Sequence, residues 1–141
     1  MKVLPLPNAQ PTLTPVLTPS GNATPAFNPN RKVALPTMEG FSFERVHQIV
    51  SLEAQGNYTC LHFLDGRQIL VCKTLRDMET LLANERQFVR IHRSHTINLN
   101  HLQKYIKGKG GYVVMEDGAN LNVSSGKKQD FLTAMAAYFG G

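Results

Sequence analysis

All eight prolines of this 141-residue chain fall within its first 36 residues, so the chain divides into two parts of different composition. The proline-rich part contains no Asp or Glu and few large apolar side chains. Such a segment cannot bury enough surface to offset the entropy that it would lose on ordering. We therefore predict a disordered tail over residues 1–36 and one folded domain over residues 37–141. Removing the tail should leave the melting temperature of the domain nearly unchanged.

The formal charge of +5 is shared unevenly between these two parts. Lys2, Arg31 and Lys32 give the tail +3, which leaves twelve cations and ten acids, or +2, for the domain. The start of the chain does not resemble a signal peptide, because Pro5 interrupts its apolar run at once. No apolar run reaches the length of a membrane span, and two cysteines make no disulfide framework. We therefore expect a cytoplasmic protein with no membrane partner.

Short strand patterns separated by turn residues fill the first half of the folded part. Residues 49–53 and 58–64 favour strands, and Asp65-Gly66 predicts a two-residue hairpin turn into a further strand over residues 68–73. Apolar residues then repeat at helical spacing over residues 75–84. Thr74, followed by Asp77 three residues later, resembles a capping box and predicts where this short helix begins.

The second half continues the same pattern. Strands are predicted over residues 88–91 and 104–106, and Asp117-Gly118 predicts a second hairpin between strands at 112–115 and 120–123. A C-terminal helix with one apolar stripe follows, and Ser124 is the candidate for its N-cap. The predicted class is therefore mainly β with two short helices.

The segment from Phe88 to Asn98 is the most informative about function, because apolar residues there are interleaved with cations, imidazoles and hydrogen-bond donors. From Arg86 to Lys109 the chain has six Lys or Arg, three His and no acid. Release of counterions from DNA or RNA favours binding to such a basic patch. An ordinary solvated surface can have the same composition, so charge alone leaves both interpretations open.

A metal site is the first alternative to consider, since Cys60, His62 and Cys72 fall on the two arms of one predicted hairpin. A two-residue turn at Asp65-Gly66 would place Cys60 opposite Val71, so that Cys72 leaves from the opposite surface of the sheet. The group also lacks a fourth ligand, whereas structural zinc sites are four-coordinate. We predict no metal and no other cofactor.

Three short motifs suggest chemistry but lack the residues that the chemistry needs. Ser124-Ser125-Gly126-Lys127 has the S-x-x-K spacing of serine acyl-enzymes without an S-D-N or K-T-G companion. Lys107-Gly108-Lys109-Gly110-Gly111 lacks the G-K-[ST] ending of a phosphate-binding loop and indicates a mobile basic loop. The RNA-recognition signature fails at most positions around residues 109–116. We therefore predict that the protein is not an enzyme.

Five motifs in a fixed order carry a resemblance to a known family. They are Ser51-Leu52-Glu53-Ala54-Gln55-Gly56-Asn57-Tyr58, then Asp65-Gly66, then Lys73-Thr74-Leu75, then Phe88-x-Arg90-Ile91-His92-Arg93-Ser94-x-x-Ile97-Asn98, then Val123-Ser124. Together they resemble the LytTR DNA-binding domain of bacterial transcription regulators, over residues 43–139. The resemblance implies an elongated, mostly antiparallel β domain that binds double-stranded DNA with loop side chains instead of a recognition helix.

The resemblance assigns DNA binding to three segments, at residues 55–58, 92–94 and 124–128. The residues that it implies are Gln55, Asn57, Tyr58, His92, Arg93, Ser94, Ser124, Ser125, Lys127 and Lys128. Further contacts to phosphates are expected from Arg90, His95, Lys107 and Lys109. The assignment requires the three segments to share one surface, with two of them entering successive major grooves and the middle one crossing between.

Two features depart from the family pattern. Ser125 stands where members commonly carry an arginine, which weakens one expected major-groove contact. Many relatives also join this domain to a phosphate-accepting receiver domain, for which the 36-residue tail has no room. The expectation is a regulator without an in-chain receiver, with a homodimer on repeated sites left open. The alternative is a β-rich protein-interaction or anti-regulator module with the same fold, which Ser125 and the domain charge of +2 favour.

Overall fold

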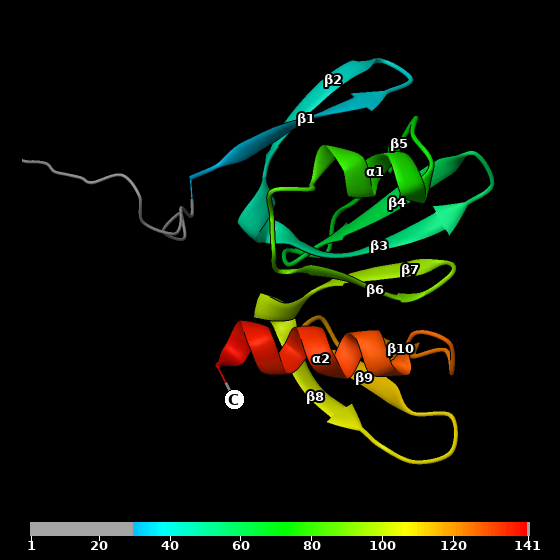
Figure 1. The fold of residues 1–141 in the computed structure, drawn as a ribbon. Helices are drawn as coiled ribbons and strands as arrows, with labels where there is room; N and C mark the ends of the chain where they lie inside the picture. Colours follow the sequence, from blue (N-terminus) through cyan, green and yellow to red (C-terminus); the bar gives the residue numbers. More distant parts are fainter. Residues whose placement is uncertain (1–29, 141) are drawn as a thin grey trace, which may run out of the picture.

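The computed structural model describes residues 30–140 and consists mainly of antiparallel strands, with two α-helices (Figure 1). In chain order the elements are β1 Lys32–Thr37, β2 Gly40–Arg45, the 3-10 helix η2 Val46–Gln48, β3 Ile49–Gln55, β4 Tyr58–Phe63, β5 Gln68–Val71, α1 Leu75–Leu81, β6 Phe88–His92, β7 His95–Asn98, the 3-10 helix η3 Leu99–His101, β8 Leu102–Ile106, β9 Tyr112–Met115, β10 Asn120–Asn122 and α2 Lys128–Phe139. The mainly β class with two helices is thus confirmed. Neither helix in the described part of the chain is long and apolar enough to cross a membrane.

A five-stranded antiparallel sheet in the order β5-β4-β3-β7-β6 forms the centre of the molecule. The β1–β2 hairpin and α1 cover one of its faces, and the three-stranded sheet β10-β9-β8 with α2 covers the other (Figure 1). The central sheet therefore has an apolar core on each side.

The two cores draw on neighbouring residues of the same strand. Ile49 and Leu52 belong to the core beneath α1, whereas Val50 belongs to the core on the α2 side. Successive strand residues point to opposite faces, so Ile49 and Leu52 can share a face only if the alternation is broken between them. The register of β3 against β4 does shift between Ile49 and Ser51, which is a β-bulge or a similar irregularity.

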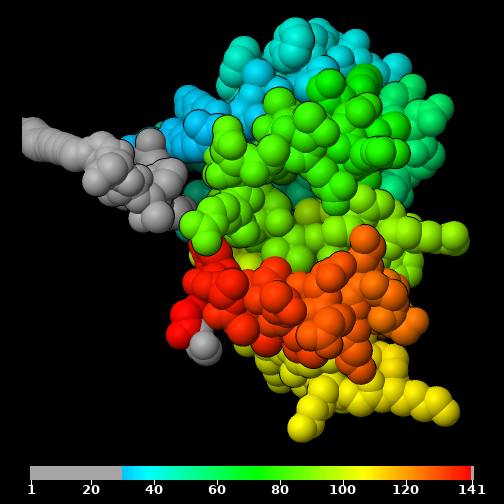
Figure 2. All heavy atoms as spheres, in the orientation of Figure 1, coloured from blue at the N-terminus to red at the C-terminus, as the bar shows by residue number. Residues whose placement is uncertain are grey.

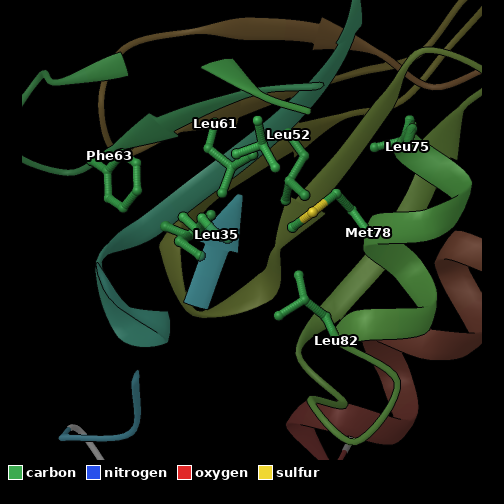
Figure 3. Packing of buried hydrophobic residues seen from close by; sticks show 9 residues of the cluster. Leu35, Leu52, Leu61, Phe63, Leu75, Met78 and Leu82 are labelled. Atoms are coloured by element: carbon green, nitrogen blue, oxygen red, sulfur yellow. The ribbon is translucent and has the colours of Figure 1, made fainter. Parts of the chain in front are cut away.

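The core beneath α1 joins residues that lie far apart in the sequence. Leu35 of β1, Leu61 of the central sheet and Met78 of α1 converge on one apolar interior (Figure 3), and none of the three is exposed to solvent. Leu35 lies in the part of the sequence that the composition assigns to the tail. The structured domain therefore begins earlier than the predicted boundary at residue 36, because β1 starts at Lys32. Residues 1–29 lie outside the described part of the chain.

Pro36 explains why the sequence does not predict a strand at β1. A proline lacks the backbone N–H that a central strand position donates, so a proline argues against a strand in general. The β1–β2 hairpin is a two-stranded sheet, in which Pro36 lies opposite Phe41. The carbonyl of Pro36 instead accepts a hydrogen bond from the amide of Cys72 at 2.8 Å, which ties the hairpin to the end of β5.

The β4–β5 hairpin is present, but its register differs by one residue from the predicted one. Phe63 donates its amide to the carbonyl of Arg67 at 2.9 Å, so the loop has three residues and ends at Gly66, whose φ is +92°. Cys60 therefore lies opposite Leu70, not Val71. This register removes the argument that Cys60 and Cys72 leave on opposite surfaces. Within residues 30–140, no group of three or more His, Cys, Asp or Glu side chains is placed to hold a metal.

One of the two predicted helix caps is confirmed and the other is wrong. The hydroxyl of Thr74 accepts a hydrogen bond from the amide of Asp77 at 3.1 Å, so Thr74 is the N-cap of α1. Ser124 does not cap α2, because a turn over residues 125–127 intervenes and the helix begins at Lys128. The carbonyl of Ser124 closes that turn by accepting the amide of Lys127 at 3.0 Å.

Replacing Leu35 with alanine tests whether β1 belongs to the folded domain. A fully buried leucine leaves a cavity when it is truncated, so we expect the free energy of unfolding to fall by ~2–5 kcal/mol. Phe43→Ala is the matched control, since Phe43 is also on the hairpin but is 65% exposed. Denaturant unfolding of the full chain measures both variants. Equal and small losses would show that β1 does not contribute to the core.

Candidate nucleic-acid interface

The β3–β4 turn and the β6–β7 turn lie side by side at one edge of the central sheet, namely the edge formed by the ends of its strands. β3 pairs with β7, with Glu53 opposite His95. Beyond that pair, the amide of Ala54 donates to the carbonyl of Ser94 at 2.8 Å, so the ladder continues into both turns. Gln55, Asn57 and Tyr58, the side chains predicted for the first turn, are all exposed.

The segment between β10 and α2 is held against the same edge. The amide of Ser124 donates to the carbonyl of Ile91 at 2.9 Å, which ties this segment to β6 just before the β6–β7 turn. The ammonium group of Lys128 donates to the carbonyl of Gly108 at 3.3 Å, which adds the β8–β9 loop. Four loops that are far apart in the sequence are therefore joined at one edge.

These loops occupy the right-hand side of the molecule in Figure 1, where the β3–β4 turn, the β6–β7 turn and the beginning of α2 are stacked. In Figure 2 the yellow-green and yellow segments of the β6–β7 turn and the β8–β9 loop project furthest from this side. The exposed side chains there include Arg93 of the first segment and Lys107 and Lys109 of the second. We call this surface, formed by residues 55–58, 92–94, 107–109 and 124–128, the loop edge.

Arg90 holds the β6–β7 turn from behind. Its Nε donates to the carbonyl of His92 at 2.8 Å and its Nη2 to the carbonyl of Arg93 at 2.6 Å. Its Nη1 also forms an ion pair with Glu79 of α1 at 2.9 Å. The guanidinium of Arg90 is therefore used within the protein, and it fixes the backbone from which Arg93 projects.

The sequence contains a signal for this inward position of Arg90. Residues two apart on a strand share a face, and the apolar Phe88 stands two residues before Arg90. A strand pattern that places Phe88 toward α1 places Arg90 on the same side. The basic character of Arg90 predicts a phosphate contact, whereas its acidic partner Glu79 on α1 is not evident from the sequence spacing.

His92, Ser94 and His95 form a compact group within the same turn. The amide of Ser94 donates to Nδ1 of His92 at 3.1 Å, which leaves Nε2 of His92 as the nitrogen that carries the proton in the neutral ring. The rings of His92 and His95 meet edge to face with centroids 5.6 Å apart. His95 is half-buried, and burial holds its pKa below the ordinary value. Glu53 opposes this shift in the pKa, while His92, His62 and Arg90 add to it.

The fold separates some members of the basic segment that the sequence brings together. Arg86 precedes β6, at the opposite end of that strand from the β6–β7 turn. His101 is 3% exposed, and its Nε2 donates to the carbonyl of His47 at 2.6 Å, so it is a structural residue. The run of cations from Arg86 to Lys109 is therefore not one continuous patch.

Comparisons with known proteins identify the family of this chain. A family model described as the LytTr DNA-binding domain matches residues 40–136 of the chain. The chain belongs to the LytTR DNA-binding domain family. The solved LytTR domain of a protein described as a methyl-accepting/DNA response regulator from Bacillus cereus has a similar fold. The match covers 74% of this chain and 95% of that one, with a TM-score of 0.64 and 24% sequence identity.

One relative with a described role is similar over a shorter part of its length. The chain is 34% identical over 100 residues to the CO-responsive transcriptional regulator RcoM of Rhodospirillum rubrum. The matched region is 70% of this chain but 42% of the relative, so this LytTR protein corresponds to less than half of that regulator.

The lowered pKa of His95 predicts how stability depends on pH. A histidine whose pKa is lower in the folded than in the unfolded protein binds its proton more readily when unfolded, so stability falls as the pH drops below about 6.5. We expect His95→Gln to make this decline shallower, because glutamine does not titrate. Denaturant melts of both proteins between about pH 7.5 and 5 measure the slope. A pKa for His95 above its ordinary value, read by NMR, would contradict the assignment.

Proposed function

We propose that this LytTR protein is a transcription regulator that binds double-stranded DNA sequence-specifically through the loop edge. The observation that carries the proposal is the backbone linkage of the three family segments: Ala54 to Ser94, at 2.8 Å, and Ser124 to Ile91, at 2.9 Å. These bonds fix the relative positions of loops that must contact one duplex together. Phosphate contacts position a protein on DNA, and side chains that reach the base edges supply specificity.

The β3–β4 and β6–β7 turns supply the donors and acceptors suited to base edges. Asn57 can pair with adenine through both the carbonyl oxygen and the NH2 group of its amide, and Gln55 has the same chemistry on a longer side chain. Arg93, exposed at the tip of the middle turn, can bind guanine with two donors or lie in a narrow minor groove. Ser94 can donate to a phosphate, and Tyr58, with a side chain 40% exposed, can donate from its phenol.

Lysines of the β8–β9 loop and of the start of α2 supply charge for the phosphates. Lys107 and Lys109 are exposed in the β8–β9 loop, and Lys127 and Lys128 precede or begin α2. Each neutralised phosphate releases counterions, so the affinity should fall steeply with salt. We assign Arg90 a positioning role instead of a phosphate contact, because its guanidinium already binds two turn carbonyls and Glu79.

Selection of bound sequences from random duplex DNA tests the proposed function. Enrichment of one sequence, bound in a salt-dependent manner and without any reaction on the DNA, is the expected outcome. Sedimentation of the resulting complex then counts how many copies bind each site, which tests for a homodimer on repeated sites.

One observation favours the second candidate, a protein-interaction module. Phe41 and Phe43 on the outer face of the β1–β2 hairpin are 66% and 65% exposed, and Met38 in its turn is 79% exposed. Exposed apolar patches often mark protein contacts. If random duplex DNA yields no enriched sequence while a protein partner binds this hairpin, the second candidate is correct.

Arg93→Ala is expected to weaken binding to the selected duplex by ~1–3 kcal/mol without affecting the fold, because a side chain that contacts a base is removed. Arg45→Ala is the matched control, since it removes the same charge from an exposed position at the end of β2. Fluorescence anisotropy at fixed salt gives both affinities. If Arg93→Ala binds as tightly as the unaltered protein, the assignment of Arg93 to the DNA fails.

Ser125→Arg is expected to create a preference for guanine at one position of the site. Ser125 is exposed in the turn before α2, and an arginine there restores the forked donor that the family pattern carries. An arginine bound to guanine O6 and N7 discriminates against other bases by ~1–3 kcal/mol. Parallel selections with the two proteins, followed by titrations at two salt concentrations, separate base recognition from added charge. Uniformly tighter binding with no new preference would show that Ser125 does not face a base.

A further inference from the structure

A cavity of about 260 Å³ lies between α1 and the central sheet, outside the loop edge. Its floor is formed by Leu52 of β3, Phe88 of β6 and Thr96 of β7, and Leu82 at the end of α1 contributes to its wall. Leu52 and Leu82 also belong to the core beneath α1 (Figure 3), so the cavity is a gap at the margin of that core. Apolar side chains therefore line part of the inner surface, and Glu79, Glu85, Arg86 and Thr96 line the rest.

The floor contains one polar group that the protein leaves unsatisfied. Thr96 is 2% exposed, and its hydroxyl has no hydrogen-bond partner among the described residues. A buried hydroxyl without a partner costs free energy, so such groups are normally paired with protein or with a molecule in the space that they face. Thr96 is one of the residues that line the cavity, so a polar group bound there lies next to this residue.

The charged residues of the cavity differ in whether they are paired. Glu79 forms an ion pair with Arg90, and Glu85 forms one with Arg31. Arg86, which also lines the cavity and is exposed, has no ion pair or side-chain hydrogen bond within residues 30–140. Both carboxylates are thus neutralised by the protein, and an unpaired cation remains at the rim.

We propose that this cavity binds a small aromatic acid with a polar substituent opposite its carboxylate, a hydroxybenzoate being the simplest member of the class. The ring lies between Leu82 and Phe88, the substituent meets the Thr96 hydroxyl and the carboxylate meets Arg86. A dry apolar cavity of about 150 Å³ is large enough to hold a benzene ring, so the volume here has room for the ring and its two groups. An aromatic amine is disfavoured, because it would face Arg86 and two carboxylates that are already paired.

Occupancy of the cavity also affects the β6–β7 turn, an inference that rests on the proposed DNA-binding function. Glu79 lines the cavity and pairs with Arg90, whose other nitrogens hold the carbonyls of His92 and Arg93. A ring inserted between α1 and β6 displaces Glu79 from Arg90 and loosens the turn. Binding of the acid and binding of DNA therefore oppose each other through one ion pair, and the opposition is reciprocal.

NMR titration of the full chain with 4-hydroxybenzoate, in the absence of DNA, tests the cavity. We expect shifts of the amides of Leu82, Phe88 and Thr96, and binding of benzoate that is about three- to tenfold weaker because it leaves Thr96 unpaired. Thr96→Val should remove the difference between the two acids. Arg86→Gln should weaken the binding of both acids, whereas Arg76→Gln, which removes an exposed arginine on α1, should not.

Three results would overturn the site: no shifts at cavity residues up to about 10 mM acid, unchanged binding in Ala83→Trp, whose side chain fills the cavity, or tighter binding of 4-hydroxybenzylamine.

The coupling is measured separately, by anisotropy of the selected duplex with and without saturating 4-hydroxybenzoate. We expect at least about fivefold weaker DNA binding, and no such effect in Glu79→Gln. Acid that binds the cavity without changing the affinity for DNA would overturn the coupling. Failure to find any DNA ligand would instead concern the proposed function, since the NMR titration does not need DNA.

Discussion

The central sheet of this protein is apolar on both faces, and that constraint determines the rest of the structure. Neither face can be left to water, so the chain must supply a cover for each. The β1–β2 hairpin with α1 and the three-stranded sheet with α2 are those covers. β3 serves both cores at once, because the shift in its register allows Ile49 and Leu52 to reach one side and Val50 the other.

Covering both faces also determines where the loops lie. The β3–β4 and β6–β7 turns lie at the same end of the central sheet. The segment at Ser124 joins them there, because the amide of Ser124 donates a hydrogen bond to the carbonyl of Ile91 in β6. Loops that carry function are usually mobile, yet these are anchored by backbone hydrogen bonds and by Arg90. Specific contacts to base edges need donors held in fixed positions, so this rigidity is consistent with the proposed role in sequence recognition.

Much of this fold could be predicted from sequence, because the local signals agree with the global structure. The pairs Asp65-Gly66 and Asp117-Gly118 locate two hairpins, and Thr74 locates the start of α1. β1 escaped prediction because it contains Pro36 and adjoins the proline-rich segment. β7 is not evident from the sequence because its four residues, from His95 to Asn98, are mostly polar. The predicted register of the β4–β5 hairpin differs from the observed one by one residue, because the loop that ends at Gly66 has three residues and not two. A turn signal therefore predicts that a hairpin exists better than it predicts the length of the loop.

The sequence indicates which residues to assign to the candidate site, but not how the fold assembles them. The order of the motifs points to the three segments, whereas their linkage depends on pairing between β3 and β7, which are about forty residues apart in the chain. The inward role of Arg90 depends on Glu79, and the cavity beside Thr96 depends on how closely α1 approaches the sheet. These features arise from tertiary packing, and no local pattern encodes them.

Amide shift mapping by NMR on addition of the selected duplex tests the central claim most directly, because it locates the DNA on the protein without altering any residue. We expect the largest changes at residues 55–58, 92–94 and 124–128 together, with small changes in the β1–β2 hairpin. Changes confined to one of the three segments, or centred on the hairpin, would contradict the claim that the linked loops form a single DNA-binding surface.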